Sequence, residues 1–212
     1  MKRKRKITFL ATAILCGVIF WPAPTRCALI TIEIEAVVDS VWDASNYLEG
    51  KIRPADTMTG TYTCDSDTPD SATEEWLGKY EYSQAPYGMI LEVGDFRFET
   101  APEDVDFIIY VSNDRLSPKG DIYNIVSKSN LPLSNGTPVE SIWWQLNDNT
   151  ASALSSDALP TTFPFLNDWE ANVLGIDAYR RYGISAHVTS AIPEPCTIIL
   201  LGLGGLVLRK RS

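Results

Sequence analysis

The sequence predicts an all-β protein: a single antiparallel β-sandwich domain, flanked by an N-terminal signal helix and a C-terminal hydrophobic helix. Three observations predict the β domain. Short segments alternate apolar and polar residues with a period of two, as half-buried strands do. Clusters of Pro, Gly, Asp, Asn and Ser separate these segments. No repeat of about 20–50 residues, the mark of a solenoid or propeller, is present.

The expected strands follow one another along the chain. Leu29–Val37 ("LITIEIEAV") alternates most clearly. The segment 89–100 reads as two strands joined at Val93-Gly94-Asp95, and Asn135-Gly136 is a strong turn signal. The other expected strands are 60–65, 79–83, 105–112, 121–128, 141–148 and 182–190. Such short strands, regularly interrupted by turn residues, are typical of a sandwich or barrel.

Helical periodicity is scarce, and Phe165–Leu174 ("FLNDWEANVL") is its one candidate. Leu166, Trp169 and Val173 stand three and four residues apart, as on one face of a helix. We expect this segment to form a short turn of helix or a loop over the edge of the sandwich.

Residues 1–27 predict a secretory signal peptide. Five cations follow Met1, and the apolar run Ile7–Trp21 comes next. Thr25 and Cys27 have suitable spacing for positions −3 and −1, so we expect cleavage after Cys27. An uncleaved anchor, or a lipid anchor on one of the cysteines, is the alternative, although large residues precede both Cys16 and Cys27.

Residues 191–212 end the chain with a motif, an apolar run and a basic tail. Pro193, Glu194 and Pro195 precede the twelve residues Thr197–Leu208, which are shorter than the roughly 20 that a membrane helix needs. The basic tail, which would stay on the cytoplasmic side and stop transfer, consists of Arg209, Lys210 and Arg211. We expect this run to anchor the chain, because the long basic side chains can reach the membrane surface.

Together these parts resemble the PEP-CTERM sorting signal, which marks exported proteins of Gram-negative bacteria that make exopolysaccharide. The resemblance covers Pro193–Ser212 and departs from the common pattern at Ile192, where Val is usual. It implies an exosortase-like processing enzyme as a partner, besides signal peptidase. It also implies a precursor anchored transiently in the inner membrane, and delivery to the cell surface or extracellular matrix.

The domain between the ends, residues 28–190, shows a second resemblance. "GTYTCD" (Gly60–Asp65), an acid-rich loop, "APYGM" (Ala85–Met89) and "LSSDALPT" (Leu154–Thr161) resemble a recurrent domain of uncharacterised exported bacterial proteins. Members commonly have an aromatic residue where this chain has Cys64. The resemblance implies the fold class and export, and no activity.

The domain is strongly acidic. The two ends hold nine of the 18 Lys and Arg and one of the 27 Asp and Glu, so residues 28–192 have a net charge of −17. Such a surface repels phosphate backbones, which excludes nucleic acid as an expected partner, and it favours solubility. Cys64 is the only cysteine in the domain, so no internal disulfide forms, and we expect it to pack as a small apolar residue.

Asp65, Asp67 and Asp70 ("DSDTPDS") form a possible Ca²⁺ site, because closely spaced carboxylates supply hard oxygen ligands. The loop lacks the glycine and the distal glutamate of an EF-hand. A solvated acidic turn is therefore the default interpretation. No other cofactor is expected.

Trp143 and Trp144 are candidates for stacking on sugar rings. Adjacent strand residues point to opposite faces, so one indole belongs in the core and the other is exposed or covered by a loop. The single histidine, His187, lies on an expected strand and is more readily interpreted as a packed polar residue than as a base.

No motif indicates an enzyme. The chain has no Gly-x-Ser-x-Gly nucleophile elbow and no His/Cys cluster for zinc, and its many carboxylates single out no glycosidase pair. We expect a non-catalytic matrix or polysaccharide-associated protein, with exopolysaccharide as the ligand. A small carbohydrate-active enzyme and a purely structural surface protein without a ligand are the alternatives.

Overall fold

The computed structural model describes residues 29–116, 119–160 and 166–194. The regular secondary structure of this part of the chain is almost entirely β-strand. The strands are β1 (Leu29–Asp43), β2 (Thr57–Asp65), β3 (Leu77–Tyr82), β4 (Gly88–Val93), β5 (Phe96–Glu99), β6 (Phe107–Leu116), β7 (Lys119–Ser127), β8 (Ser141–Asp148), β9 (Ala171–Ala178) and β10 (Tyr182–Pro193). A single 3-10 turn, η1 (Leu166–Asp168), precedes β9.

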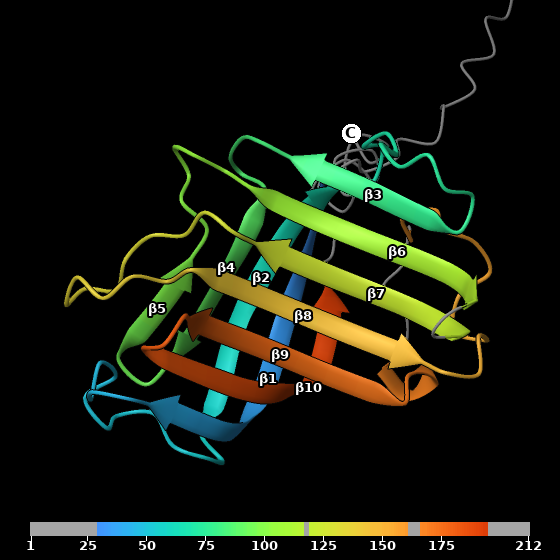
Figure 1. Cartoon of the computed structure of the whole chain (residues 1–212). Coiled ribbons are helices and arrows are strands. Elements are labelled where there is room, and N and C mark those ends of the chain that lie inside the picture. Colours follow the sequence, from blue (N-terminus) through green and yellow to red (C-terminus); the bar gives the residue numbers. More distant parts are fainter. Residues whose placement is uncertain (1–28, 117–118, 161–165, 195–212) are drawn as a thin grey trace, which may run out of the picture.

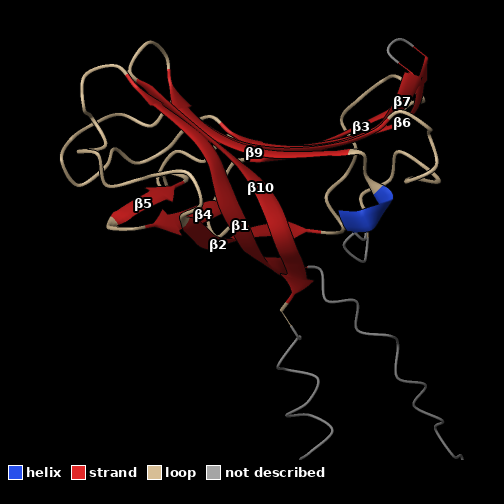
Figure 2. Cartoon of the chain, turned by 90° about the horizontal axis from the view of Figure 1, so that it is seen from below, coloured by secondary structure: helices blue, strands red, loops and turns tan. Residues whose placement is uncertain are grey.

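All ten strands form one antiparallel sheet in the order β3-β6-β7-β8-β9-β10-β1-β2-β4-β5. Figure 1 shows β3, β6, β7, β8 and β9 as one layer, with β2, β4 and β5 crossing behind it. Figure 2 shows β1 and β10 curving out of the first layer toward the second. The sheet therefore curls until its two halves face each other.

The prediction of an antiparallel all-β fold is confirmed. The prediction of two separate sheets, as in a sandwich, is wrong. β1 and β10 are long and belong to both layers, and their pairing is interrupted between Glu35 and Ala36 and again between Val38 and Ser40. Such bulges bend a strand and increase its twist, so one strand pair turns the corner that a loop would turn in a sandwich. The expected flanking helices lie outside the described residues.

The core lies between the two halves of the sheet and joins them. Tyr62 of β2 meets Trp144 of β8 edge to face, with ring centroids 6.3 Å apart. The Tyr62 hydroxyl also lies 3.3 Å from the hydroxyl of Tyr123 on β7, within hydrogen-bond distance. All three side chains are buried, so aromatic contacts hold the layers together where no disulfide does.

Both edges of the sheet are occupied by other segments of the chain. On β3, the Lys79 amide donates to the Asp70 carboxylate (2.8 Å) and its carbonyl accepts from Ser71 (2.9 Å). On β5, the Glu99 carbonyl accepts from the amide of Leu131 (2.8 Å). These contacts take up backbone groups that would otherwise be open to a strand from another molecule.

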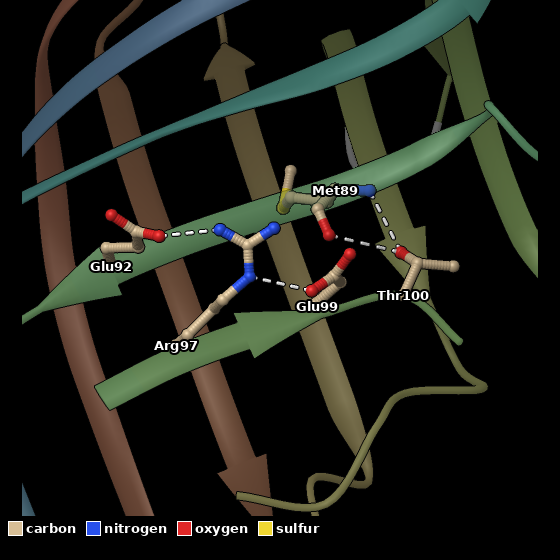
Figure 3. Close-up of polar contacts among 5 residues, drawn as sticks. All are labelled: Met89, Glu92, Arg97, Glu99 and Thr100. Atoms are coloured by element: carbon tan, nitrogen blue, oxygen red, sulfur yellow. Dashed lines mark hydrogen bonds and ion pairs between the residues drawn. The ribbon is translucent and has the colours of Figure 1, made fainter. Parts of the chain in front are cut away.

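Charged side chains tie β5 to β4 on the outer surface. Figure 3 shows the Arg97 guanidinium between two carboxylates, 2.6 Å from Glu92 and 2.7 Å from Glu99. Beyond the end of β5, Thr100 continues the pairing, because its hydroxyl accepts from the Met89 amide (2.9 Å). The edge strand β5 is only four residues long, and it is thus held by side chains as well as by its backbone.

The predicted strand segments overlap nine of the ten strands, with β1 longer than predicted, and β9 was missed. Of the helical candidate Phe165–Leu174, the short turn at Leu166–Asp168 is confirmed, while Ala171–Leu174 begins β9 instead. The pairing of β9 with β8 and β10 overrides the weak helical spacing of this segment.

Candidate functional site

The adjacent tryptophans lie on opposite faces of β8, as the alternation predicts. Trp144 is fully buried, and its indole nitrogen donates to Asn172 (2.9 Å), so it is not available to stack on a sugar. Trp143 is only partly buried and lies on the outer face. Of the two predicted stacking residues, Trp143 alone remains a candidate.

The Trp143 indole lies flat across the neighbouring strand β9. Its partner in the register is Gly175, where a methyl group would come within 2.3 Å of the indole atom Cε2. The indole nitrogen donates to the Asp177 carboxylate (3.3 Å). Because Gly175 has no side chain, the Trp143 ring can lie over it, and the hydrogen bond to Asp177 orients the ring.

A second tryptophan, Trp42 on β1, forms the other wall of a groove with Trp143. Trp42 is 54 % exposed, and both tryptophans line a hollow of about 350 Å³ on the outer face of β8, β9, β10 and β1. The register brings Ser40, Ser185, Gly175 and Trp143 into one row across these strands. The next row contains Trp42, Gly183 and Asp177.

Small residues form the floor of the groove. A methyl group added at Gly183 would have no atom within 4 Å, so the space above this strand is open. Ser40 and Ser185 also line the groove and supply hydroxyl groups. We call this hollow, with its lining residues Ser40, Val41, Trp42, Trp143, Ile176, Asp177, Gly183, Ile184 and Ser185, the tryptophan groove.

Asp177 is the only ionisable residue among the described residues that line the tryptophan groove. Partial burial raises the pKa of its carboxyl, the hydrogen bond from Trp143 opposes that shift, and the nearby charge of Glu140 adds to it. Glu140 itself accepts from the Tyr179 amide (3.0 Å) and pairs with Arg181 (3.2 Å). The groove thus presents two indole faces, two hydroxyls and one carboxylate.

The three aspartates of the predicted Ca²⁺ site do not come together. One Asp65 oxygen accepts from the Asp67 amide (2.9 Å), and one Asp70 oxygen accepts from the amides of Ala72 and Lys79 (2.8 Å each). Over the described ranges, no group of three or more His, Cys, Asp or Glu side chains is placed to hold a metal ion. The Asp65 and Asp70 carboxylates instead shape the loop, and Asp70 also binds the edge strand β3.

Cys64 is buried as the sequence predicts, but the expectation that His187 is a packed polar residue is wrong, because its side chain is 48 % exposed. The Cys64 thiol is buried, and this burial raises its pKa to about 12, which makes it a poor nucleophile. His187 lies on the outer face of β10, two positions beyond Ser185, with its Nδ1 atom 2.7 Å from Asp39. Neither residue lines the tryptophan groove.

The predicted sorting motif begins at the last residues that the structure describes. Pro193 ends β10 opposite Ile32, and the Glu194 amide donates to the Thr31 carbonyl (2.8 Å). Pro195, the predicted signal peptide 1–27 and the basic tail, Arg209, Lys210 and Arg211, lie outside the described residues. In the portion that is described, no helix has the length and apolar character needed to cross a bilayer.

No family model, no curated protein and no solved structure matches this chain. Sequence reasoning missed Trp42 and Asp177, because neither stands in a recognisable motif. A usable signal was the continued strand character of Val37–Asp43, which places Trp42 on a strand rather than in a loop.

Proposed function

We propose that this is an exported, non-catalytic protein that binds polysaccharide outside the cell through the tryptophan groove. The observation that carries the proposal is the pair of indoles, Trp42 and Trp143, on either side of a floor of glycine and serine. A pyranose ring has an apolar face of C–H groups that packs on an aromatic ring. Its hydroxyls form hydrogen bonds with groups such as Ser40, Ser185 and Asp177.

The shape of the groove supports a chain-like ligand. Three strand spacings separate β8 from β1, a span of about 14 Å between the two strands that carry the tryptophans. The groove lies on a sheet face, and its serines and tryptophans belong to regular strands. The ligand would therefore meet a preformed surface, which lowers the entropy cost of binding.

The ends of the chain support export. The basic and apolar layout of residues 1–27 favours a cleaved signal helix, and Pro193–Ser212 resembles the PEP-CTERM sorting signal. We infer a C-terminal hydrophobic helix that holds the precursor in the inner membrane until an exosortase-like enzyme processes it. The acidic domain, with a net charge of −17 over residues 28–192, would remain soluble outside.

Replacing Pro193, Glu194 and Pro195 together with alanine is expected to leave the protein in the inner membrane with its tail still attached. The processing enzyme would no longer recognise its motif, whereas the apolar run and basic tail would be intact. Fractionation and C-terminal mass spectrometry measure this result. Glu103→Ala, at an exposed loop position, is the control and should be released normally. Normal release of the triple variant would contradict the proposed sorting motif.

Trp42→Ala and Trp143→Ala are each expected to weaken polysaccharide binding by about tenfold, equivalent to about 1.4 kcal/mol. Affinity electrophoresis of the purified full-length protein, in gels containing neutral, amino or acidic polysaccharides, measures the effect. Trp76→Ala is the matched control, because Trp76 is 39 % exposed just before β3 and does not line the groove. Its binding should be unchanged.

The same experiment separates the alternative functions. If no polysaccharide retards the protein, the purely structural alternative replaces the proposal. If mass spectrometry detects shortened oligosaccharides after incubation, the carbohydrate-active enzyme replaces it. If Trp76→Ala weakens binding as much as the two groove variants, the ligand binds elsewhere.

A further inference from the structure

We propose that the ligand of the tryptophan groove is an amino-polysaccharide, a chain of glucosamine-type sugars whose free amino groups are protonated. This inference rests on the proposed function and adds the chemical class of the ligand. Three features of the groove carry it: a carboxylate with a free oxygen, the absence of a competing cation from the lining, and two indoles in the same groove, one of them bonded to that carboxylate.

Asp177 has one oxygen available to a ligand. Its Oδ2 atom accepts from the Trp143 indole (3.3 Å), and its Oδ1 atom accepts no hydrogen bond from any described residue. A protonated amine that donates to Oδ1 forms a charge-assisted hydrogen bond, which is shorter and stronger than one from a neutral hydroxyl. A neutral sugar would bury this carboxylate further without neutralising its charge.

Arg181, on the turn between β9 and β10, is already paired with an acid, because it lies 3.2 Å from Glu140. The His187 ring lies 2.7 Å from Asp39. No Lys, Arg or His is among the described residues that line the groove. A uronic acid chain would therefore meet Asp177 without a compensating positive charge, and the net charge of −17 over residues 28–192 would repel it.

The indoles favour the same ligand. A cation is attracted to the face of an aromatic ring, and tryptophan is the strongest of the aromatic side chains in this respect. Trp143 holds its ring beside Asp177 through the hydrogen bond between them. An ammonium group bound to Asp177 would thus also lie near a ring face, while the C–H face of its own sugar packs on an indole.

Isothermal titration of the full-length protein in mild detergent tests the inference with three oligosaccharides of equal length. These are glucosamine oligomers, their fully N-acetylated counterparts and cello-oligosaccharides, which share the same backbone linkage. At mildly acidic pH we expect the glucosamine oligomers to bind at least about tenfold more tightly than the other two, a difference that shrinks as salt screens the charges. Asp177→Asn should abolish the preference while retaining an oxygen that accepts from Trp143.

Gly183→Val provides a second test that leaves every charge and both tryptophans in place. The added side chain extends into the open floor of the groove, and valine is well suited to a strand, so folding should be preserved. We expect binding of the glucosamine oligomers to be lost. If this variant binds them as tightly as the original protein, the attraction comes from the overall charge of the domain and the inference is overturned.

The outcomes distinguish the two proposals. Equal binding of all three oligosaccharides would overturn the amino-sugar inference and leave polysaccharide binding at the groove supported. Tighter binding of the acetylated or glucose oligomers would likewise overturn the amino-sugar inference and leave polysaccharide binding at the groove supported. If no oligosaccharide binds and polysaccharides fail as well, the proposed function itself is overturned.

Discussion

Trp144→Ala is expected to lower the free energy of unfolding by about 3–5 kcal/mol, the usual cost of removing a large aromatic side chain from a core. Trp144 is fully buried, meets Tyr62 edge to face, and donates to Asn172 from its indole nitrogen. Its loss leaves a cavity between the two halves of the sheet and removes one of the two donors to the Asn172 oxygen, which keeps only the Val188 amide (3.3 Å). Urea unfolding, followed by circular dichroism, measures the change.

The neighbouring residue supplies the matched control. Trp143→Ala removes the same side chain from the outer face of the same strand, so we expect a loss of less than about 1.5 kcal/mol. This variant should lose polysaccharide affinity, whereas Trp144→Ala should lose stability. Equal destabilisation by the two substitutions would contradict the assignment of Trp144 to the core and Trp143 to the surface.

The contrast between these two residues shows what period-two alternation can predict. On β8 the alternation runs without interruption over Ser141–Asp148, and every second side chain is buried. The same signal identifies β1, β2 and β7. It failed for β9, because Ala171–Ala178 has three consecutive buried residues, and Gly175 is buried by the Trp143 ring rather than by the core.

The path of the sheet was beyond the reach of the sequence. Alternation shows which side chains face inward, but it does not show whether a strand stays in one layer. β1 changes layer at bulges near Glu35 and Val38, and the alternation of the first half, Leu29–Val37, gives no warning of them. The predicted sandwich therefore had the right class and the right inner faces, with one sheet too many.

Only part of the candidate site could be predicted from the sequence, for a similar reason. Trp143 could be found, since a pair of adjacent tryptophans on a strand must place one of them outside the core. Its partner Trp42 lies far away in the sequence, and only the pairing of β1 with β10 and of β10 with β9 brings it to the groove. The roles of Gly175 and Asp177 likewise depend on cross-strand register, which sequence periodicity does not reveal.

Asp148→Asn is expected to destabilise the protein by about 3 kcal/mol at neutral pH, because it leaves backbone amides that donate to this carboxylate without their acceptor. The Asp148 carboxylate is 2 % exposed and organises the loop after β8. One oxygen accepts from the Thr150 hydroxyl (2.6 Å) and amide (2.8 Å), and the other accepts from the amides of Ser152 (2.7 Å) and Ala153 (3.0 Å). An asparagine would turn an N–H group toward one of these pairs of donors.

The same hydrogen bonds give this effect a pH dependence. Chiefly through the Thr150 hydroxyl, and further through the loop amides, they hold the pKa of the Asp148 carboxyl far below its usual range, against the opposing effect of burial. A depressed folded-state pKa contributes stability that is fully present above the unfolded pKa, about 4, and is lost progressively as the pH falls below it. The difference between Asp148→Asn and the original protein should therefore shrink in acid.

Unfolding by urea at neutral pH and at several acidic pH values tests both parts of this prediction. Asp95→Asn, at an exposed turn, is the control and should stay within about 0.5 kcal/mol of the original protein. A second buried carboxylate, Asp121, faces Asp148 across the strand pair and accepts from the amides of Asp114 (2.9 Å) and Leu154 (2.8 Å). If repulsion between the two carboxylates outweighs their hydrogen bonds, Asp148→Asn will stabilise the fold, and the structural role assigned to this carboxylate will be wrong.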